Sequence, residues 1–230
     1  MRELVRYAAP SVVDLYVTAA AAQRYAALVE SASAAGVFVH SVSDEVLAAM
    51  ADAETPQGML AVAQQPEPTL ADVLAASPRL LVLLQEVRDP GNLGTVIRAA
   101  DASGADAVLV TDSSVDVFSP KVVRSTAGSL FHLPVVTGLD AEATLAEVAS
   151  HGIRTLATEG EAALTLPHVD LAGRHCWVLG TEAQGLPDHL AAACAERVSI
   201  PIYGKAESLN LAMAATICLY ASAAAQHGIQ

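Results

Sequence analysis

The sequence predicts an α/β fold with a mostly parallel sheet, preceded by a smaller α/β domain. Short apolar runs alternate with segments of helical pattern, which is typical of parallel strands joined by helices. Polar loops containing glycine follow several of these runs, and such loops open at the sheet edge where open α/β proteins bind ligands. The chain has 230 residues, 53% of them apolar, which is enough for one large domain with a small companion.

The first region, residues 1–63, contains three predicted strands and two predicted helices. The strands are expected over 12–17, 37–40 and 60–63, and the helices over 20–34 and 44–50. This order predicts a small α/β layer with parallel strands. Residues 64–78 contain three prolines and are interpreted as a linker.

The second region, residues 79–230, repeats the alternation more strongly. Its strands are expected over 80–84, 107–110, 134–136, 153–157, 176–179 and 198–200. Its helices are expected over 93–102, from Ser119-Pro120, and over 141–150, 187–195 and 209–226. The pattern predicts a parallel sheet covered by helices on both faces.

Composition limits the classes of function. The formal net charge of −13 argues against a general nucleic-acid binder, which usually has a basic surface. The few basic residues nevertheless gather in or near the polar loops: Arg88, Arg98, Lys121, Arg124, Arg197 and Lys205. We therefore expect an acidic body with a locally basic site.

The cysteines and the apolar segments indicate a cytoplasmic protein that does not enter a membrane. Cys176, Cys194 and Cys218 show no metal-ligand spacing, and their odd, sparse count suits a reducing compartment. No signal peptide is visible at the amino terminus. The most apolar stretch, 211–225, is shorter than the roughly 20 residues needed to span a bilayer.

The first candidate site is Asn92-Leu93-Gly94, which follows a predicted strand and leads into a helix carrying Arg98. Glycines allow close backbone approach, and a helix start favours an anion such as phosphate. A plain tight turn is the alternative for the loop, and Arg98 is either a phosphate clamp or a side chain that extends to the surface. The spacing GxGxxG is absent, which disfavours a nicotinamide dehydrogenase.

Two further loops lie downstream. Gly180-Thr181-Glu182 follows a predicted strand, where a carboxylate could orient a polar ligand or cap a helix. Ser208-Leu209-Asn210 precedes the last helix, where Ser208 could be the helix cap. Asn210 lies between two leucines, and a buried amide there needs hydrogen-bond partners.

In order and spacing, these motifs resemble those of the SpoU family of RNA ribose methyltransferases, in the SPOUT superfamily. The similar segment runs from Leu80 to Gln226 and includes Gly180-Thr181-Glu182-Ala183-Gln184-Gly185 and Ile200-Pro201. Residues 12–66, including Thr55-Pro56-Gln57-Gly58, resemble less strongly the small substrate-binding domain of that family.

The resemblance implies a deep trefoil knot near the carboxyl end, which forms the pocket for S-adenosylmethionine. It implies 2′-O-methylation of a ribose in ribosomal or, less favoured, transfer RNA, without a metal, by a homodimer that pairs through the knotted domain. The implied cofactor-binding residues are Thr158, Leu179, Gly180, Gly185, Ile200, Ile202 and Leu209. The implied catalytic residues are Arg98, Asn92, Glu182, Ser208 and Asn210, with Arg98 beside the target hydroxyl and its phosphate. Arg98 is either the base or, because arginine rarely loses its proton, an electrostatic group, and the second role is favoured.

The chain departs from the family pattern at its start. Family members usually begin with a basic segment and a further strand, whereas Met1-Arg2-Glu3-Leu4 enters within the first helix. We therefore interpret the small domain as truncated, with a sheet edge exposed. The short start and the acidic charge favour the alternative of a non-catalytic RNA-binding or assembly factor, whereas the retained motifs favour the enzyme.

Overall fold

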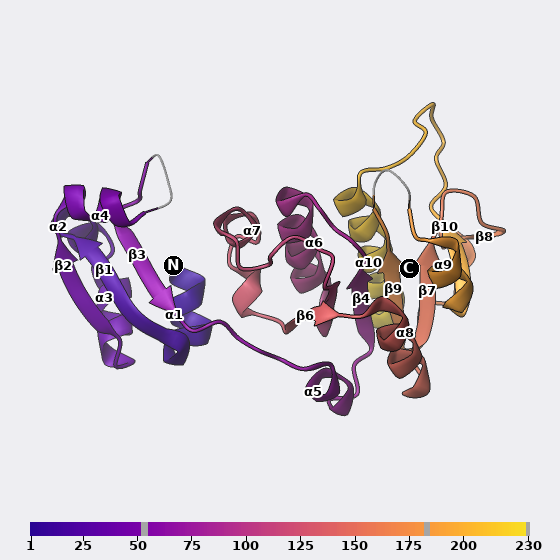
Figure 1. Cartoon of the computed structure of the whole chain (residues 1–230), viewed down its shortest axis with the longest axis horizontal. Helices are drawn as coiled ribbons and strands as arrows, with labels where there is room; N and C mark the ends of the chain where they lie inside the picture. Colours follow the sequence, from indigo (N-terminus) through magenta and orange to yellow (C-terminus); the bar gives the residue numbers. More distant parts are fainter. Residues whose placement is uncertain (52–54, 182–184, 229–230) are drawn as a thin grey trace. The chain divides into compact units, whose positions relative to one another are not determined.

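The computed structural model describes residues 1–51, 55–181 and 185–228. By internal contacts the chain divides into two compact units, Met1–Glu67 and Pro68–Gln230 (Figure 1). The first unit contains α1 (Arg2–Ala8), β1 (Val12–Thr18), α2 (Ala19–Arg24), α3 (Ala26–Ala34), β2 (Phe38–Val42), α4 (Asp44–Met50) and β3 (Met59–Ala63).

The three strands of the first unit form a mixed sheet in the order β2-β1-β3. Strand β2 is parallel to β1, but β3 is antiparallel to it, so the prediction of parallel strands throughout this layer is wrong. Strand β3 begins beside the end of β1, with Met59 opposite Val17. Strand β2 also ends there, with Val42 opposite Thr18, so the chain leaves β2 and enters β3 at the same edge of the sheet. Strand β3 therefore runs in the opposite direction to β1 and β2.

The second unit is a seven-stranded sheet in the order β6-β5-β4-β9-β7-β10-β8, and every pair in it is parallel, as the alternation predicts. The strands are β4 (Leu80–Leu84), β5 (Ala107–Thr111), β6 (Val135–Leu139), β7 (Arg154–Thr158), β8 (Leu164–Thr165), β9 (His175–Leu179) and β10 (Glu196–Ser199). The helices are α5 (Leu70–Ala75), α6 (Pro90–Ser103), α7 (Pro120–Ser125), α8 (Ala141–Ser150), α9 (Asp188–Ala193) and α10 (Leu211–His227).

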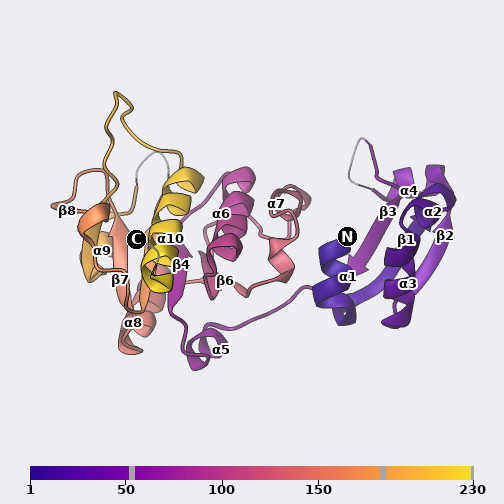
Figure 2. The same cartoon turned by 180° about the vertical axis from the view of Figure 1, so that it is seen from behind.

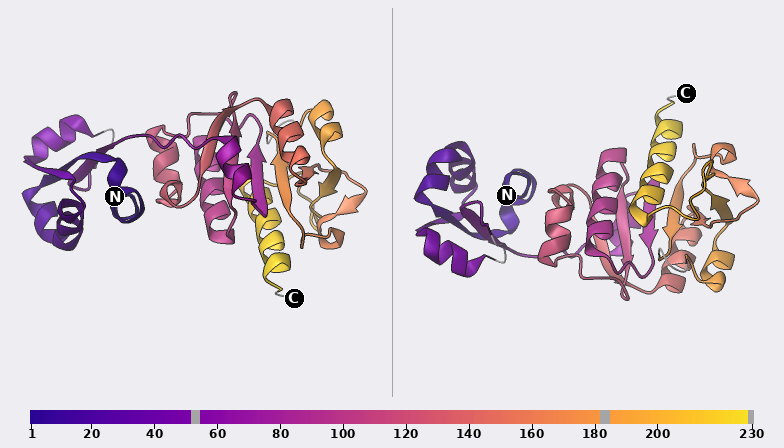
Figure 3. Two further views of the ribbon diagram at one scale, coloured as in Figure 1. Left: turned by 90° about the horizontal axis from the view of Figure 1, so that it is seen from below. Right: turned by 90° about the horizontal axis from the view of Figure 1, so that it is seen from above.

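Helices cover both faces of this sheet, which confirms the prediction (Figure 3). One core cluster joins the sheet to α6 and α10 through residues such as Ile97 and Leu219. The other joins it to α5, α8 and α9 through residues such as Val73 and Leu145. Because apolar residues fill both sides, β4, β5 and β9 consist of buried residues only.

Helix α5 lies inside the segment interpreted as a linker, so that interpretation is wrong for residues 70–75. Thr69 and Asp72 form a reciprocal capping box at its start. Leu70, Val73 and Leu74 are buried in the second core cluster. Their i, i+3, i+4 spacing carries the helical signal, which the surrounding prolines obscure in the sequence.

A buried cluster of hydrogen-bonded side chains links α10 to β9. The Trp177 Nε1–H donates to the Ser222 hydroxyl over 2.8 Å, and the His175 Nε2 lies 2.7 Å from the same oxygen. The His175 Nδ1 lies 2.8 Å from the Gly173 carbonyl oxygen. All three side chains are buried, and burial lowers the pKa of His175 below its usual value.

We expect the free energy of unfolding to fall as the pH falls below about 6.5, the usual pKa of histidine. The unfolded chain then binds a proton that His175 in the folded protein does not bind, so acidification favours unfolding. The measurement is urea unfolding between pH 8 and pH 5.5, where His175→Gln is expected to show a smaller loss than the unsubstituted protein. An exposed histidine replaced in the same way, His151→Gln, is the control. Equal losses in all three proteins would contradict the prediction.

Candidate functional site

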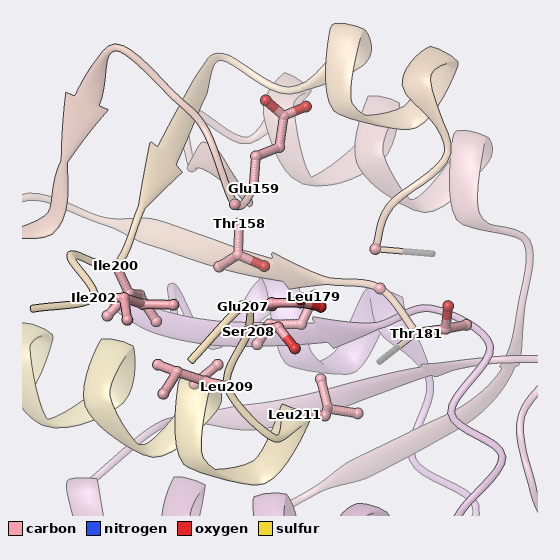
Figure 4. Close-up of a pocket in the computed structure, with 14 residues that line it drawn as sticks. Thr158, Glu159, Leu179, Thr181, Ile200, Ile202, Glu207, Ser208, Leu209 and Leu211 are labelled. Carbon is pink, nitrogen blue, oxygen red and sulfur yellow. The ribbon is translucent and has the colours of Figure 1, made fainter. Parts of the chain in front are cut away.

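A pocket opens at the carboxyl ends of three neighbouring strands, β9, β7 and β10 (Figure 4). Its volume is about 290 Å³. Fourteen residues line it: Thr158, Glu159, Gly160, Leu179, Gly180, Thr181, Gly185, Ile200, Ile202, Glu207, Ser208, Leu209, Leu211 and Ala214. The site is therefore assembled from segments that lie up to 56 residues apart along the chain, between Thr158 and Ala214, at the edge where open parallel sheets bind ligands.

Thr181 and Gly185, which follow β9, pair through their backbones. The Thr181 amide donates to the Gly185 carbonyl oxygen over 3.1 Å, and the Gly185 amide donates to the Thr181 carbonyl oxygen over 2.9 Å. A Cβ atom at Gly180 would lie 2.1 Å from that Gly185 oxygen, so only glycine fits there. Gly185 itself has a φ of +66°, which favours glycine.

All seven residues that the family resemblance implies for cofactor binding line this one pocket: Thr158, Leu179, Gly180, Gly185, Ile200, Ile202 and Leu209. The apolar side chains come from β9 and from the segment before α10, and the Thr158 hydroxyl donates to the Val178 carbonyl oxygen over 3.2 Å. Their roles as ligand contacts remain predictions.

The sequence motifs do not identify two carboxylates of the pocket lining, Glu159 and Glu207. Glu159 directly follows β7, and its carboxylate lies 3.2 Å from the Arg197 guanidinium. Glu207 directly precedes Ser208. The signal that could have found Glu159 is its place at a strand's carboxyl end, whereas Glu207 lies in a segment with no strand or helix pattern.

The first and third motifs meet through a hydrogen bond. The Asn210 side-chain amide donates to the Asn92 side-chain oxygen over 3.0 Å, although the two residues are 118 positions apart. The Asn210 oxygen accepts from the amides of Ala212 and Met213, so Asn210 also caps α10. These contacts lie where α6 and α10 run side by side (Figure 2).

The helix boundaries here differ from the prediction. Helix α6 begins at Pro90, because the Asp89 carboxylate accepts from the Asn92 amide over 2.7 Å and proline suits the first position. Asn92 therefore lies in the first turn of the helix rather than in a loop before it. Likewise α10 begins at Leu211, and its cap is Asn210 rather than Ser208.

The remaining candidate catalytic residues are placed differently. Ser208 lines the pocket, whereas Asn92, Arg98 and Asn210 do not belong to the lining. Arg98 is exposed on α6, one helical turn beyond Gly94. Glu182 lies outside the described residues.

We expect the Asn92–Asn210 contact to couple the two helix starts. In a double-mutant cycle of Asn92→Ala and Asn210→Ala, the coupling free energy should be about 0.5–1 kcal/mol, typical of a hydrogen bond near the surface. Asn210→Ala alone should lower the free energy of unfolding by about 1 kcal/mol more than Asn92→Ala does, because it also removes the cap of α10. Urea unfolding of the four proteins measures both quantities. Additive effects of the two substitutions would show that the contact contributes no stability.

The fold and the pocket define an α/β protein that binds a ligand at the carboxyl edge of a parallel sheet. Residues 79–220 match the family model for the SpoU rRNA Methylase family, and residues 2–69 match the model for RNA 2′-O ribose methyltransferase substrate binding. The chain therefore belongs to the SpoU rRNA methylase family.

Two relatives illustrate the similarity in sequence. The 23S rRNA (guanosine(2553)-2′-O)-methyltransferase RlmP of Bacillus subtilis is 35% identical over 80% of this chain and 72% of its own length. The 23S rRNA (guanosine-2′-O-)-methyltransferase RlmB of Bordetella pertussis is 31% identical over 97% of this chain and 94% of its own.

Two solved structures of methyltransferases are similar to this chain. The SpoU methyltransferase AviRb of Streptomyces viridochromogenes, in complex with AdoMet, is 28% identical with a TM-score of 0.83, over 96% of this chain and 85% of its own. The AdoMet-bound rRNA methyltransferase of Sinorhizobium meliloti is 27% identical with a TM-score of 0.78, over 96% of this chain and 81% of its own.

Proposed function

We propose that this protein transfers the methyl group of S-adenosylmethionine to the 2′-hydroxyl of a ribose in ribosomal RNA. The observation that carries the proposal is the pocket at the ends of β9, β7 and β10, whose lining contains every residue expected to hold the cofactor. Membership of the SpoU rRNA methylase family supports the reaction. Relatives that act on 23S rRNA favour ribosomal over transfer RNA.

The lining suits S-adenosylmethionine in its chemistry. Leu179, Ile200 and Leu209 offer apolar contacts for an adenine ring, and the close-packed backbone at Gly180 can approach a ligand. Carboxylates such as Glu159 can accept hydrogen bonds from hydroxyl groups or attract a cation. When bound, S-adenosylmethionine supplies an activated methyl group, so the protein has mainly to orient the acceptor.

Arg98 is the residue proposed to act on the acceptor. Its guanidinium stays charged and would bind the phosphate next to the target ribose, lowering the cost of negative charge on the 2′-oxygen. The hydrogen bond between Asn210 and Asn92 links the starts of α6 and α10. Ser208 in the pocket lining, and Glu182, complete the proposed set.

A homodimer that pairs through the second unit is part of the proposal. Helix α10 exposes Met213, Ile217 and Tyr220 at 62%, 40% and 51%, and their i, i+4, i+7 spacing puts them on one side of the helix. An apolar stripe of this kind supports a protein interface.

The trefoil knot expected for the family belongs to the same proposal. A cytoplasmic location also belongs to it, and the three free cysteines support that location. No helix among the described residues is long and apolar enough to cross a membrane.

Labelled S-adenosylmethionine tests the activity. The purified protein is incubated with unmodified ribosomal RNA, and with transfer RNA in a parallel reaction. We expect label in ribosomal RNA, at a position where the RNA backbone becomes resistant to alkaline cleavage. Cofactor binding without transfer to either RNA would favour the non-catalytic alternative.

A further inference from the structure

Helix α7 carries basic residues, and the segment around it contains no acidic residue. The chain has a formal net charge of −13, yet it contains no Asp or Glu between Asp116 and Asp140. Within this segment, Lys121 and Arg124 are exposed, and their i, i+3 spacing places them on one side of α7. A local positive charge on an acidic protein favours an anionic partner at that place.

Helix α7 is packed closely against the start of α6. A Cβ atom at Gly94 would lie 2.4 Å from the Ser125 Cβ, so the two backbones approach as near as glycine allows. The Ser125 hydroxyl donates to the Gly91 carbonyl oxygen over 3.0 Å, and Val122 is fully buried. The two helices lie side by side in both views (Figures 1 and 2). The position of α7 relative to α6 is therefore fixed by packing.

Arg98 lies on the side of α6 that meets α7. It follows Gly94 by four residues, and residues at this spacing lie one above the other on a helix. We refer to Arg98, Lys121 and Arg124 as the basic strip. Within the described ranges, with their gaps at 52–54 and 182–184, neither Arg98 nor Lys121 forms a salt bridge.

We propose that Lys121 and Arg124 bind phosphates of the RNA strand that flank the target ribose. This inference rests on the proposed function, because Arg98 in the same strip is the residue proposed to meet the phosphate at that ribose. Ammonium and guanidinium groups are the usual partners of RNA phosphates. The acidic charge elsewhere repels RNA, so the strip also sets the direction in which the strand crosses α6 and α7. Lys121 and Arg124 are binding residues and take no part in the chemical step.

The salt dependence of RNA binding tests the strip. Binding of the full chain to unmodified large-subunit ribosomal RNA is measured over a series of KCl concentrations. Each of Lys121→Gln and Arg124→Gln should reduce the slope of log K against log[KCl] by about 0.7–0.9, the value for one lost phosphate contact. In the methyl-transfer assay each should raise KM and leave kcat unchanged. Arg79→Gln is the control, because it removes an equal charge at the amino end of β4, the opposite edge of the sheet.

The outcomes separate the two proposals. A slope for Lys121→Gln equal to that of the unsubstituted protein, or a loss as large in Arg79→Gln, would overturn the role of the strip. Thermal unfolding identifies any misfolding of Arg124→Gln, and Lys121→Gln then decides alone. If the unsubstituted protein binds ribosomal RNA without transferring methyl groups, the proposed function fails, while the slopes still test the strip.

Discussion

Replacing Gly180 with alanine is expected to weaken the binding of S-adenosylmethionine by about 10- to 100-fold, as overpacking of this kind costs about 1–3 kcal/mol. The added Cβ would lie 2.1 Å from the Gly185 carbonyl oxygen and 2.4 Å from the Leu186 nitrogen. Both are backbone atoms, so no side chain can rotate away. The backbone at Gly185 and Leu186 must therefore move, and we expect the paired hydrogen bonds between Thr181 and Gly185 to be lost.

Isothermal titration with S-adenosylmethionine measures the effect. Gly173→Ala is the matched control, since a Cβ there would meet no atom within 4 Å and the residue does not line the pocket. We expect Gly173→Ala to bind as the unsubstituted protein does. Unchanged affinity in a folded Gly180→Ala protein would refute the claim that the close backbone packing at Gly180 shapes the cofactor pocket.

Replacing Arg98 with alanine is expected to lower kcat for methyl transfer by about 100- to 1,000-fold, the usual loss when one group that stabilises an oxyanion is removed. Affinity for S-adenosylmethionine should stay the same, because Arg98 is outside the pocket lining. Arg98 is exposed on α6, so the fold should tolerate the change.

Two further variants sharpen this experiment. Arg98→Lys keeps the charge but loses the planar pair of donors, and it should recover part of the activity. Arg79→Ala removes an exposed arginine at the amino edge of the sheet and should leave kcat unchanged. If Arg98→Ala keeps full activity, or loses cofactor affinity as well, the role assigned to Arg98 is wrong.

The parallel sheet of the second unit could be predicted because its strands are buried on both faces. A run such as Leu80–Leu84 has no polar position, and it is followed by a polar turn and a helix. The same regularity brought the candidate cofactor residues to one sheet edge, since parallel strands joined by helices all end on the same side.

Other features depend on contacts that the sequence does not reveal. The direction of β3 depends on the end of β1 beside which it begins, and the start of α6 depends on a hydrogen bond to the Asp89 side chain. Nothing local in the sequence pairs Asn92 with Asn210, because only the packing of α6 against α10 brings them together. Glu207 joins the pocket through an irregular segment, where no periodic pattern applies.

The chain contains one tryptophan, Trp177, and it is fully buried in β9 against the last helix. Its fluorescence therefore reports on the second unit alone, since residues 1–67 contain tyrosine but no tryptophan. A shift of its emission to longer wavelength would follow water reaching the seam between β9 and α10. Comparing that signal with circular dichroism of the whole chain would show whether the two units unfold together or in separate steps.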